Sequence, residues 1–206
     1  MSVLQNTCKP AGFWGKLMVR GMNGSSHARL AEWGFSFLPE LPGGSAVLDA
    51  GCGGGANVGR WLKKCPDGKV TGVDYSEISV QESTRFNSEA IRAGRCQIKQ
   101  ANVAELPFEG GSFACVSAFE TVYFWPALPD TFREIARVLQ PGGLFLICNE
   151  SNGHDPAALR FSKVIEGMKL YDRQKLSAYL EEAGFSDIRV YEAKGKPWLC
   201  LLARKE

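Results

Sequence analysis

The feature that most constrains this chain is a short apolar run that ends in an acid and leads into a glycine cluster. Residues 46–56 read Ala-Val-Leu-Asp-Ala-Gly-Cys-Gly-Gly-Gly-Ala, and apolar residues at helical spacing follow them. Glycine adopts a positive φ at the least cost, and its missing Cβ lets backbone N–H groups approach a ligand closely. The pattern therefore predicts a buried strand, a tight nucleotide-binding turn and a helix.

The charge beside this loop separates two kinds of ligand. Gly51, Gly53 and Ala56 also fit the dinucleotide-binding fingerprint, whose last position accepts alanine. Asp49 stands just before the first of these glycines, where it would face a pyrophosphate unfavourably but would attract an ammonium group. The pattern favours a ligand such as S-adenosylmethionine, which carries an ammonium and a sulfonium and no phosphate.

From Ala46 onward, strand-like and helix-like patterns alternate, which predicts an α/β fold with a parallel, doubly wound sheet and ligands at the carboxyl ends of its strands. Only Lys194–Lys196 joins the last two predicted strands, so they must pair antiparallel, because a parallel return needs a long crossover. The predicted strands are 46–50, 69–74, 95–101, 113–119, 142–150, about 186–193 and about 197–204. The predicted helices are 56–65, 76–93, 127–139 and one that Asp172 caps and Gly184 ends.

Later motifs point to one family. Asp74 ends the second predicted strand, where an acid can accept hydrogen bonds from a ribose. Leu-Pro-Phe follows at 106–108, Ser-Phe at 112–113 and Pro-Gly-Gly at 141–143. With the glycine loop, in this order and over about residues 46–150, these motifs resemble the class I S-adenosylmethionine-dependent methyltransferases, in their small-molecule, type 11-like branch.

The resemblance implies a fold and an activity. The fold is a Rossmann-like, doubly wound, seven-stranded sheet in the order 3-2-1-4-5-7-6, with the last strand antiparallel and an N-terminal helical lid. The activity is methyl transfer from S-adenosylmethionine to a nitrogen, oxygen or sulfur atom of a small molecule by in-line displacement. The chain, 1–206, would be a single domain with a helical cap over 1–45 and a cofactor-binding core over 46–206. Helical spacing places Pro10–Met22 and His27–Leu38 in the cap as two helices.

The resemblance also assigns cofactor contacts. Asp49 and the loop glycines would border the methionine and ribose, Asp74 would accept from the ribose hydroxyls, and Tyr75 would cover the adenine. Asn102, where this branch commonly has aspartate, would accept from the adenine amino group, and Val103 would offer a backbone N–H. The residues assigned to the cofactor are Asp49, Gly51, Gly53, Gly55, Asp74, Tyr75, Asn102, Val103 and Phe119.

Several catalytic and acceptor-binding candidates follow the fourth predicted strand, where the family holds the reactive sulfonium. Relatives often have a histidine there, but residues 121–126 read Thr-Val-Tyr-Phe-Trp-Pro and form an aromatic shelf instead. A base is optional when the methyl donor is already activated, so the candidates for proton removal are Glu120 and Tyr123, then His27. The candidates for contact with the acceptor are Tyr123, Trp125, Glu150 and Trp14.

Composition narrows the partners and the compartment. A net charge of +2 over 206 residues is too mild to capture nucleic acid. Seven cysteines without a C-x-x-C pair, and only two histidines, give no metal-ligand spacing. No stretch reads as a signal peptide or a membrane span. We therefore expect a cytoplasmic monomer or homodimer that acts on a small-molecule methyl acceptor, with no metal, nucleic acid or membrane involved.

Three other functions remain open on the sequence. A nicotinamide oxidoreductase would share the glycine loop, although Asp49 and the antiparallel tail disfavour it. An RNA methyltransferase would need a basic track leading to the pocket, whereas the lysines and arginines here are dispersed. A non-catalytic cofactor-binding protein or scaffold would keep the loop without turnover.

Overall fold

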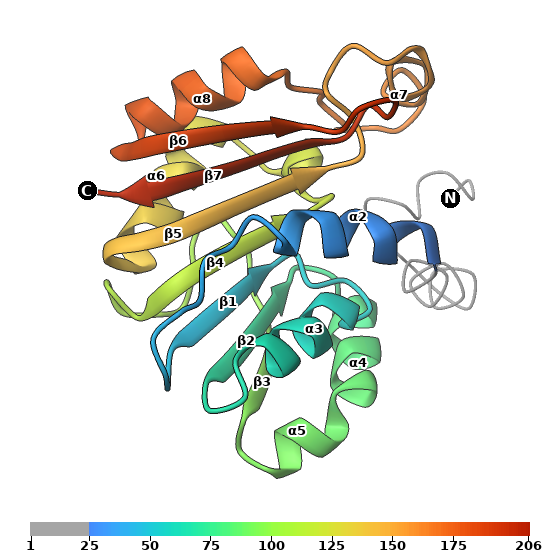
Figure 1. Cartoon of the computed structure of the whole chain (residues 1–206). Coiled ribbons are helices and arrows are strands. Elements are labelled where there is room, and N and C mark those ends of the chain that lie inside the picture. Colours follow the sequence, from blue (N-terminus) through green and yellow to red (C-terminus); the bar gives the residue numbers. More distant parts are fainter. Residues whose placement is uncertain (1–24) are drawn as a thin grey trace.

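The computed structural model describes residues 25–206, which form one mixed sheet flanked by helices (Figure 1). Seven strands lie in the order β3-β2-β1-β4-β5-β7-β6, and only β7 runs antiparallel to its neighbours β5 and β6. The predicted fold class and strand order are confirmed. The strands are β1 Ala46–Ala50, β2 Lys69–Asp74, β3 Cys96–Gln100, β4 Phe113–Phe119, β5 Leu139–Asn149, β6 Phe185–Glu192 and β7 Leu199–Lys205.

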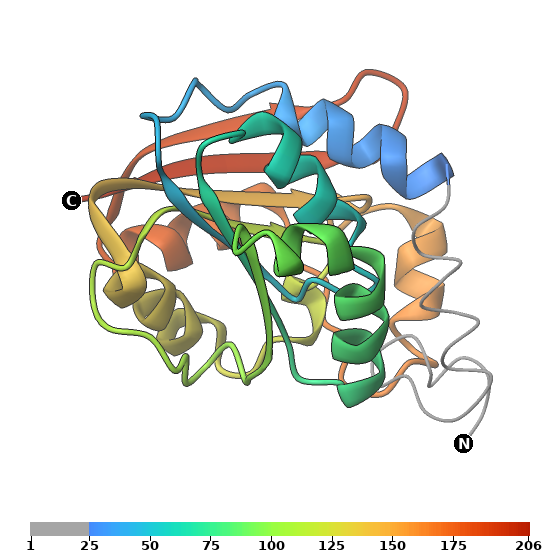
Figure 2. The ribbon, with the colours of Figure 1, turned by 90° about the horizontal axis from the view of Figure 1, so that it is seen from below.

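Helices cover both faces of the sheet (Figure 2). The helices α2 to α5 pack on one face, and α6 and α8 pack on the other. Because both faces are buried, the central strands β1 and β4 are almost continuously apolar. The helices are α2 Ser25–Phe35, α3 Ala56–Lys64, α4 Glu77–Phe86, α5 Ser88–Arg92, α6 Leu128–Val138, α7 Pro156–Phe161 and α8 Arg173–Glu182.

The long helix predicted over 76–93 is wrong: it is broken into α4 and α5 at Asn87. The buried amide of Asn87 donates to the carbonyl oxygens of both Gly55 and Ser83, at 3.0 Å each. The break therefore ties the end of α4 to the glycine loop. The break could not be predicted from the local sequence, which is helical on both sides of Asn87, because it depends on the tertiary contact with the loop.

The cap is described only in part. The predicted helix Pro10–Met22 lies outside the described residues, so the expected lid and the boundary of the cap stay untested. The second predicted helix, His27–Leu38, appears as α2 and ends at Phe35 instead. The chain tightens there, because the backbone N–H groups of Phe37 and Leu38 donate to carbonyl oxygens three residues earlier.

Two short elements were not predicted, and one strand begins earlier than expected. A 3₁₀ turn at Val122–Phe124 follows β4, and α7 follows β5. The strand predicted over 142–150 begins at Leu139, because the Pro-Gly-Gly segment is accommodated by a register shift between β4 and β5. By contrast, α8 begins as predicted, with the Asp172 carboxylate accepting from the backbone N–H of Lys175.

This arrangement brings the candidate residues to one edge of the molecule. The carboxyl ends of β1, β4 and β5 point toward the N-terminal end of α2 (Figure 1). Six of the seven cysteines lie in the described residues, and all six are buried free thiols, as expected for small core residues. No helix within residues 25–206 is both long enough and apolar enough to cross a bilayer.

Candidate functional site

The glycine loop between β1 and α3 is held by backbone hydrogen bonds. The N–H groups of Gly51 and Cys52 both donate to the carbonyl oxygen of Val73, at 2.8 Å each. The loop turns through positive φ angles of 83° at Gly51, 50° at Gly53 and 83° at Gly55. These conformations explain why the loop contains so many glycines, since L side chains rarely adopt them.

Replacing Gly51 with alanine is expected to damage both the fold and the site. The added Cβ would lie 2.4 Å from Oγ1 of Thr121. Gly44 provides a matched control, since its φ is also positive (76°) and open space surrounds it. Gly44→Ala should cost about 1–2 kcal/mol of stability from backbone strain, and Gly51→Ala a further ~1–3 kcal/mol from overpacking.

Thermal unfolding and calorimetry with S-adenosylhomocysteine measure these effects. Only Gly51→Ala should also weaken binding of this ligand, because only Gly51 borders the cavities. Equal effects of the two substitutions on stability and affinity would contradict the close approach of Thr121 to the loop.

Asp49 is the most unusual group in the site. Its side chain is buried, Oδ1 accepts a hydrogen bond from the Ser117 hydroxyl at 2.8 Å, and Oδ2 is buried without a protein partner. Burial raises the pKa of Asp49 from its ordinary 3.8 to about 7, and the nearby Asp74 adds to this rise. A buried carboxylate oxygen without a partner is unfavourable unless a cationic ligand satisfies it. The charge and the unpaired oxygen suit an ammonium group, and Asp49 lies behind the lining of the two cavities rather than in it.

Asp74 braces the loop as well as facing the cavity. Its two carboxylate oxygens accept from the backbone N–H groups of Gly53 (3.0 Å) and Ser76 (2.9 Å). Burial raises the pKa of Asp74, while these hydrogen bonds oppose the rise. Because each carboxylate oxygen has a second lone pair, Asp74 can still accept from a ribose diol. The exposed ring of Tyr75 lies beside it in the cavity wall.

Asn102 lies at the same cavity, and its side-chain oxygen already has one protein partner. Its Oδ1 accepts from the backbone N–H of Ala104 at 3.1 Å, within a turn, and the residue is exposed. The buried Val103 also lines the cavity. Phe119 is buried at the end of β4, where its ring stacks on Phe35 with centroids 4.9 Å apart.

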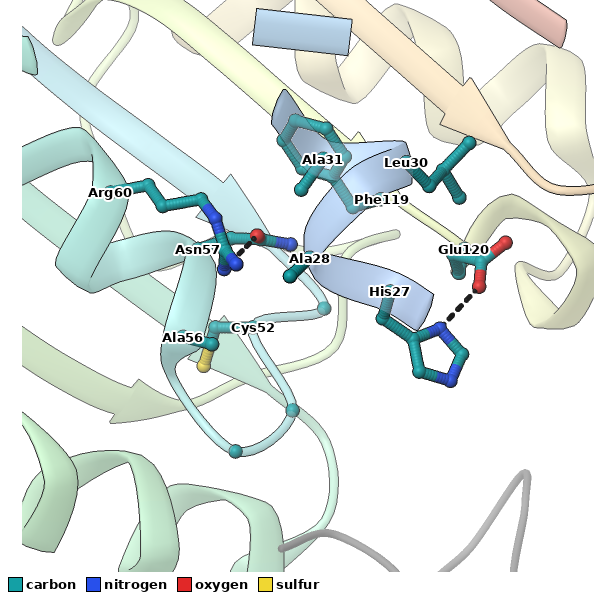
Figure 3. A pocket seen from close by; sticks show the side chains of 13 residues that line it. His27, Ala28, Leu30, Ala31, Cys52, Ala56, Asn57, Arg60, Phe119 and Glu120 are labelled. Atoms are coloured by element: carbon teal, nitrogen blue, oxygen red, sulfur yellow. Dashed lines mark hydrogen bonds and ion pairs between the residues drawn. The ribbon is translucent and has the colours of Figure 1, made fainter. Parts of the chain in front are cut away.

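Two adjacent cavities that share lining residues make up the site. The larger, about 520 Å³, is within the range typical of small-molecule and cofactor pockets. The smaller, of about 60 Å³, lies between α2 and the glycine loop and includes Arg60 and Asn57 (Figure 3). Both cavities border Gly51, Gly53, Phe119 and Glu120. Arg60 and Asn57, and the larger cavity's Glu166 and Gly167, were not predicted from the sequence, whereas Phe124 in the same lining belongs to the expected aromatic shelf.

Glu120 and His27, far apart in sequence, meet at the junction of these cavities (Figure 3). Nδ1 of His27 is hydrogen bonded to Oε2 of Glu120 at 2.8 Å, and Oε1 of Glu120 accepts from the backbone N–H of Glu150 at 2.7 Å. Glu120 adopts a positive φ of 61°, which is uncommon outside glycine. The hydrogen bond with Glu120 raises the pKa of His27, against the opposing effect of burial.

Glu150 is a second acidic residue near His27, besides Glu120. Burial and the charge of Glu120 raise the pKa of Glu150. One ligand-type atom from each of His27, Glu120 and Glu150 lies within 4.8 Å of the others, and no other such group occurs in residues 25–206. The His27–Glu120 hydrogen bond explains one of these contacts, and exposed acids such as Glu150 commonly lie near others without an ion, so the trio does not by itself indicate a metal.

One member of the expected aromatic shelf, Tyr123, lies outside the cavities, and another, Trp125, lines the larger one. The ring of Tyr123 is buried outside the lining of both cavities, and its hydroxyl accepts from the backbone N–H of Ser151 at 3.1 Å. Burial raises its pKa well above the usual range, so it is a poor base. Trp125 does line the larger cavity, although it is mostly buried and donates to Thr121. Trp14 lies outside the described residues.

This chain is similar both to a methyltransferase family model and to curated methyltransferases. Residues 48–147 match the family model described as "Methyltransferase domain". The chain is 31% identical to 27-O-demethylrifamycin SV methyltransferase of Amycolatopsis mediterranei, over 83% of this chain and 67% of that protein. It is 28% identical to squalene methyltransferase 2 of Botryococcus braunii, over 86% of this chain and 51% of that protein. The chain thus spans about half the length of the latter relative.

Solved structures share the fold at low sequence identity. A SAM-dependent methyltransferase from Aquifex aeolicus superposes with a TM-score of 0.76 at 18% identity, covering 93% of this chain and 98% of that one. A geranyl diphosphate C-methyltransferase from Streptomyces coelicolor, in complex with Mg²⁺, geranyl-S-thiolodiphosphate and S-adenosyl-L-homocysteine, gives 0.75 at 15% identity, covering 87% and 76%. At such identities the likeness establishes the fold alone.

Proposed function

Because this chain belongs to the class I S-adenosylmethionine-dependent methyltransferases, we propose that it transfers a methyl group from that cofactor to a small-molecule acceptor. The observation that carries the proposal is the buried, unpartnered Oδ2 of Asp49 beneath the glycine loop. A pyrophosphate would be repelled there, whereas the ammonium of the cofactor would supply the missing hydrogen bonds and charge.

The two ends of the cofactor match two sets of residues. At the amino-acid end, Asp49 would hold the ammonium, and Arg60 in the smaller cavity would pair with the carboxylate. At the nucleoside end, Asp74 would accept from the ribose hydroxyls, with Tyr75 against the adenine. Val103 would contact the adenine as well, and the second lone pair of the Asn102 Oδ1, which already accepts from Ala104, would accept from the adenine amino group.

The protein would contribute to the reaction by positioning the cofactor and the acceptor and by excluding water. When bound, the cofactor supplies a methyl group that is already activated by the sulfonium. Phe119 and Glu120 would face that group, and α2 covers the loop from the other side (Figure 3). Holding the acceptor atom, the methyl carbon and the sulfur in line removes much of the barrier. No strong base is needed for an acceptor that is already nucleophilic.

The larger cavity favours an acceptor with an apolar body and one polar reactive atom. Phe124, Trp125 and Pro126 line one side of it, and Glu120 provides a carboxylate at the reactive end. We propose an oxygen, nitrogen or sulfur atom as the point of methylation. A carbon acceptor is the second candidate, because the relatives include proteins named squalene methyltransferases and 24-methylenesterol C-methyltransferases.

We further propose that Glu120 and His27 act together when the acceptor has to lose a proton. With Nδ1 bonded to the Glu120 carboxylate, Nε2 of His27 is the nitrogen left to take a proton. The carboxylate would stabilise the imidazolium that results. Tyr123 is left out of this role, because its hydroxyl is buried and engaged with the backbone of Ser151.

Calorimetry with S-adenosylmethionine, S-adenosylhomocysteine and NAD tests the cofactor assignment. Heat of binding is expected with the first two and not with NAD. An acceptor screen would then measure release of S-adenosylhomocysteine, beginning with phenols and amines that carry large apolar groups. Binding of NAD alone would overturn the proposal. Cofactor binding without turnover on any acceptor would favour a non-catalytic role.

A further inference from the structure

Trp61, Ser117 and Asp49 form a chain of buried hydrogen bonds that leads to the proposed ammonium site. The parallel register of β1 and β4 sets Ser117 directly beside Asp49, and α3 lays Trp61 over them. Nε1 of Trp61 donates to Oγ of Ser117 at 2.8 Å, and Oγ of Ser117 donates to Oδ1 of Asp49 at 2.8 Å. The exposed fraction is 0% for Trp61 and Ser117 and 1% for Asp49.

The chemistry of the three groups fixes the direction of this chain. The indole N–H is a donor only, so the Ser117 oxygen must accept from Trp61. The single hydroxyl hydrogen of Ser117 is then left for the carboxylate. Trp61 is itself held against the ring of Phe35, with centroids 5.0 Å apart at 76°. One carboxylate oxygen of Asp49 is therefore tied down, and the other is left without a protein partner.

We propose that Ser117 and Trp61 are positioning residues for Asp49, which hold one carboxylate oxygen so that the other is presented to the ammonium group of the cofactor. This inference rests on the proposed function, since it assigns residues to the same cofactor site. Neither residue needs to touch the cofactor. Their effect is to keep the carboxylate in one orientation and to favour its ionised form.

The charged and titratable groups around Asp49 determine what loss of the Ser117 hydroxyl would do. Burial and Asp74 on β2 raise the pKa of Asp49, whereas Ser117 on β4 and Arg60 on α3 lower it. Cys52, in the loop above, remains a neutral thiol because burial raises its pKa well above the usual range. Removing the Ser117 hydroxyl should therefore raise the pKa of Asp49 above about 7. At neutral pH more of the carboxylate would be protonated and unable to pair with the ammonium.

Calorimetry with S-adenosylhomocysteine from pH 6 to 9 tests the inference with Ser117→Ala and Trp61→Phe. At pH 7, Ser117→Ala should weaken binding about tenfold, the size expected for a lost hydrogen bond to a charged group. The pH at which affinity reaches half its plateau should move up by about one unit. Trp61→Phe, which keeps an aromatic ring but removes the N–H, should shift both quantities in the same direction by less.

Cys115→Ala is the matched control, because Cys115 is a fully buried small residue two positions earlier on the same strand and face. It should leave both the affinity and the pH midpoint as in the wild type. If Ser117→Ala does not fold, as judged by circular dichroism, the same measurements are made on Ser117→Cys and Trp61→Phe. Ser117→Cys weakens the hydrogen bond to Asp49, since a thiol is only a weak donor.

The possible outcomes separate this inference from the proposed function. If the Ser117 and Trp61 variants both bind S-adenosylhomocysteine as tightly as the wild type, with the same pH midpoint of affinity, the positioning role is overturned. The proposed cofactor site would then still stand. Absence of binding by the wild type at every pH would overturn the proposed function and this inference with it. A weakened affinity with no change in the midpoint would show a packing effect only and would also contradict the proposed role.

Discussion

Asp49→Asn is expected to abolish most of the affinity for S-adenosylmethionine and S-adenosylhomocysteine while leaving the protein as stable as before or more stable. Asparagine keeps the shape of the side chain and an oxygen to accept from Ser117, but it has no charge to pair with the ammonium. Loss of one partner of a buried, hydrogen-bonded charge pair costs about 3–5 kcal/mol, which corresponds to a loss of affinity on the order of 100- to 5000-fold.

The gain in stability follows from the same burial. Folding raises the pKa of Asp49 from 3.8 to about 7, so the folded protein binds more protons than the unfolded chain between these pH values. Stability of the ligand-free protein therefore falls as pH rises through this window, and the ionised carboxylate costs on the order of 4 kcal/mol above it. Asparagine does not titrate, so this pH dependence should be absent from the variant.

Denaturant unfolding at pH 5 and pH 8 and calorimetry at pH 8 measure the two effects. Asp67→Asn, at an exposed acid in the turn between α3 and β2, is the control and should change neither. An asparagine variant that binds S-adenosylhomocysteine as tightly as the wild type would contradict the role of Asp49 as the ammonium partner.

Glu120→Gln is expected to reduce kcat about 10²- to 10⁴-fold, the usual range for a lost general acid–base group, on any acceptor that must be deprotonated. Affinity for S-adenosylhomocysteine should change little, because the proposed cofactor contacts lie on β1, β2 and α3 and in the loops after β2 and β3. Glutamine can still accept from the backbone N–H of Glu150, so the local backbone should be preserved. The substitution removes the negative charge beside His27.

The pH profile separates a proton-transfer role from a structural one. Glu120 raises the pKa of His27, and a histidine acts as a base only when neutral. Activity of the wild type should therefore rise with pH through the raised pKa of His27, and in Glu120→Gln the rise should occur at lower pH. Initial rates of S-adenosylhomocysteine release across pH 5 to 9 measure this, with Glu32→Gln on the exposed side of α2 as the control. An unchanged profile would contradict the pairing.

Sequence reasoning predicted the elements well where the deciding interactions are local. The strand ends at Ala46–Ala50 and Lys69–Asp74 match because glycine and acidic residues end each apolar run. The antiparallel pairing of the last two strands was predicted from the short connection between them. The helix over 76–93 failed because Asn87 is drawn to a carbonyl of the glycine loop, a contact between residues 32 positions apart.

The candidate site was predicted less completely. Glu120 and His27 were each named as possible bases, but nothing in their local sequence indicates that they form a hydrogen bond across 93 positions. Tyr123 was named for the same role because it follows the end of a strand. The 3₁₀ turn after β4 instead buries its ring and leaves the neighbouring Phe124 in the cavity wall.

By itself, the sequence determined the succession of strands along the chain, the glycine turn and the preference for a cationic ligand, because backbone freedom, apolar periodicity and charge act over a few neighbouring residues. Only the tertiary structure decided that Trp61 and Ser117 hold one oxygen of Asp49 and leave the other free. Such contacts depend on strand register and on the face that each helix turns to the sheet. Burial then sets the protonation of the groups, and burial is a property of the folded chain as a whole.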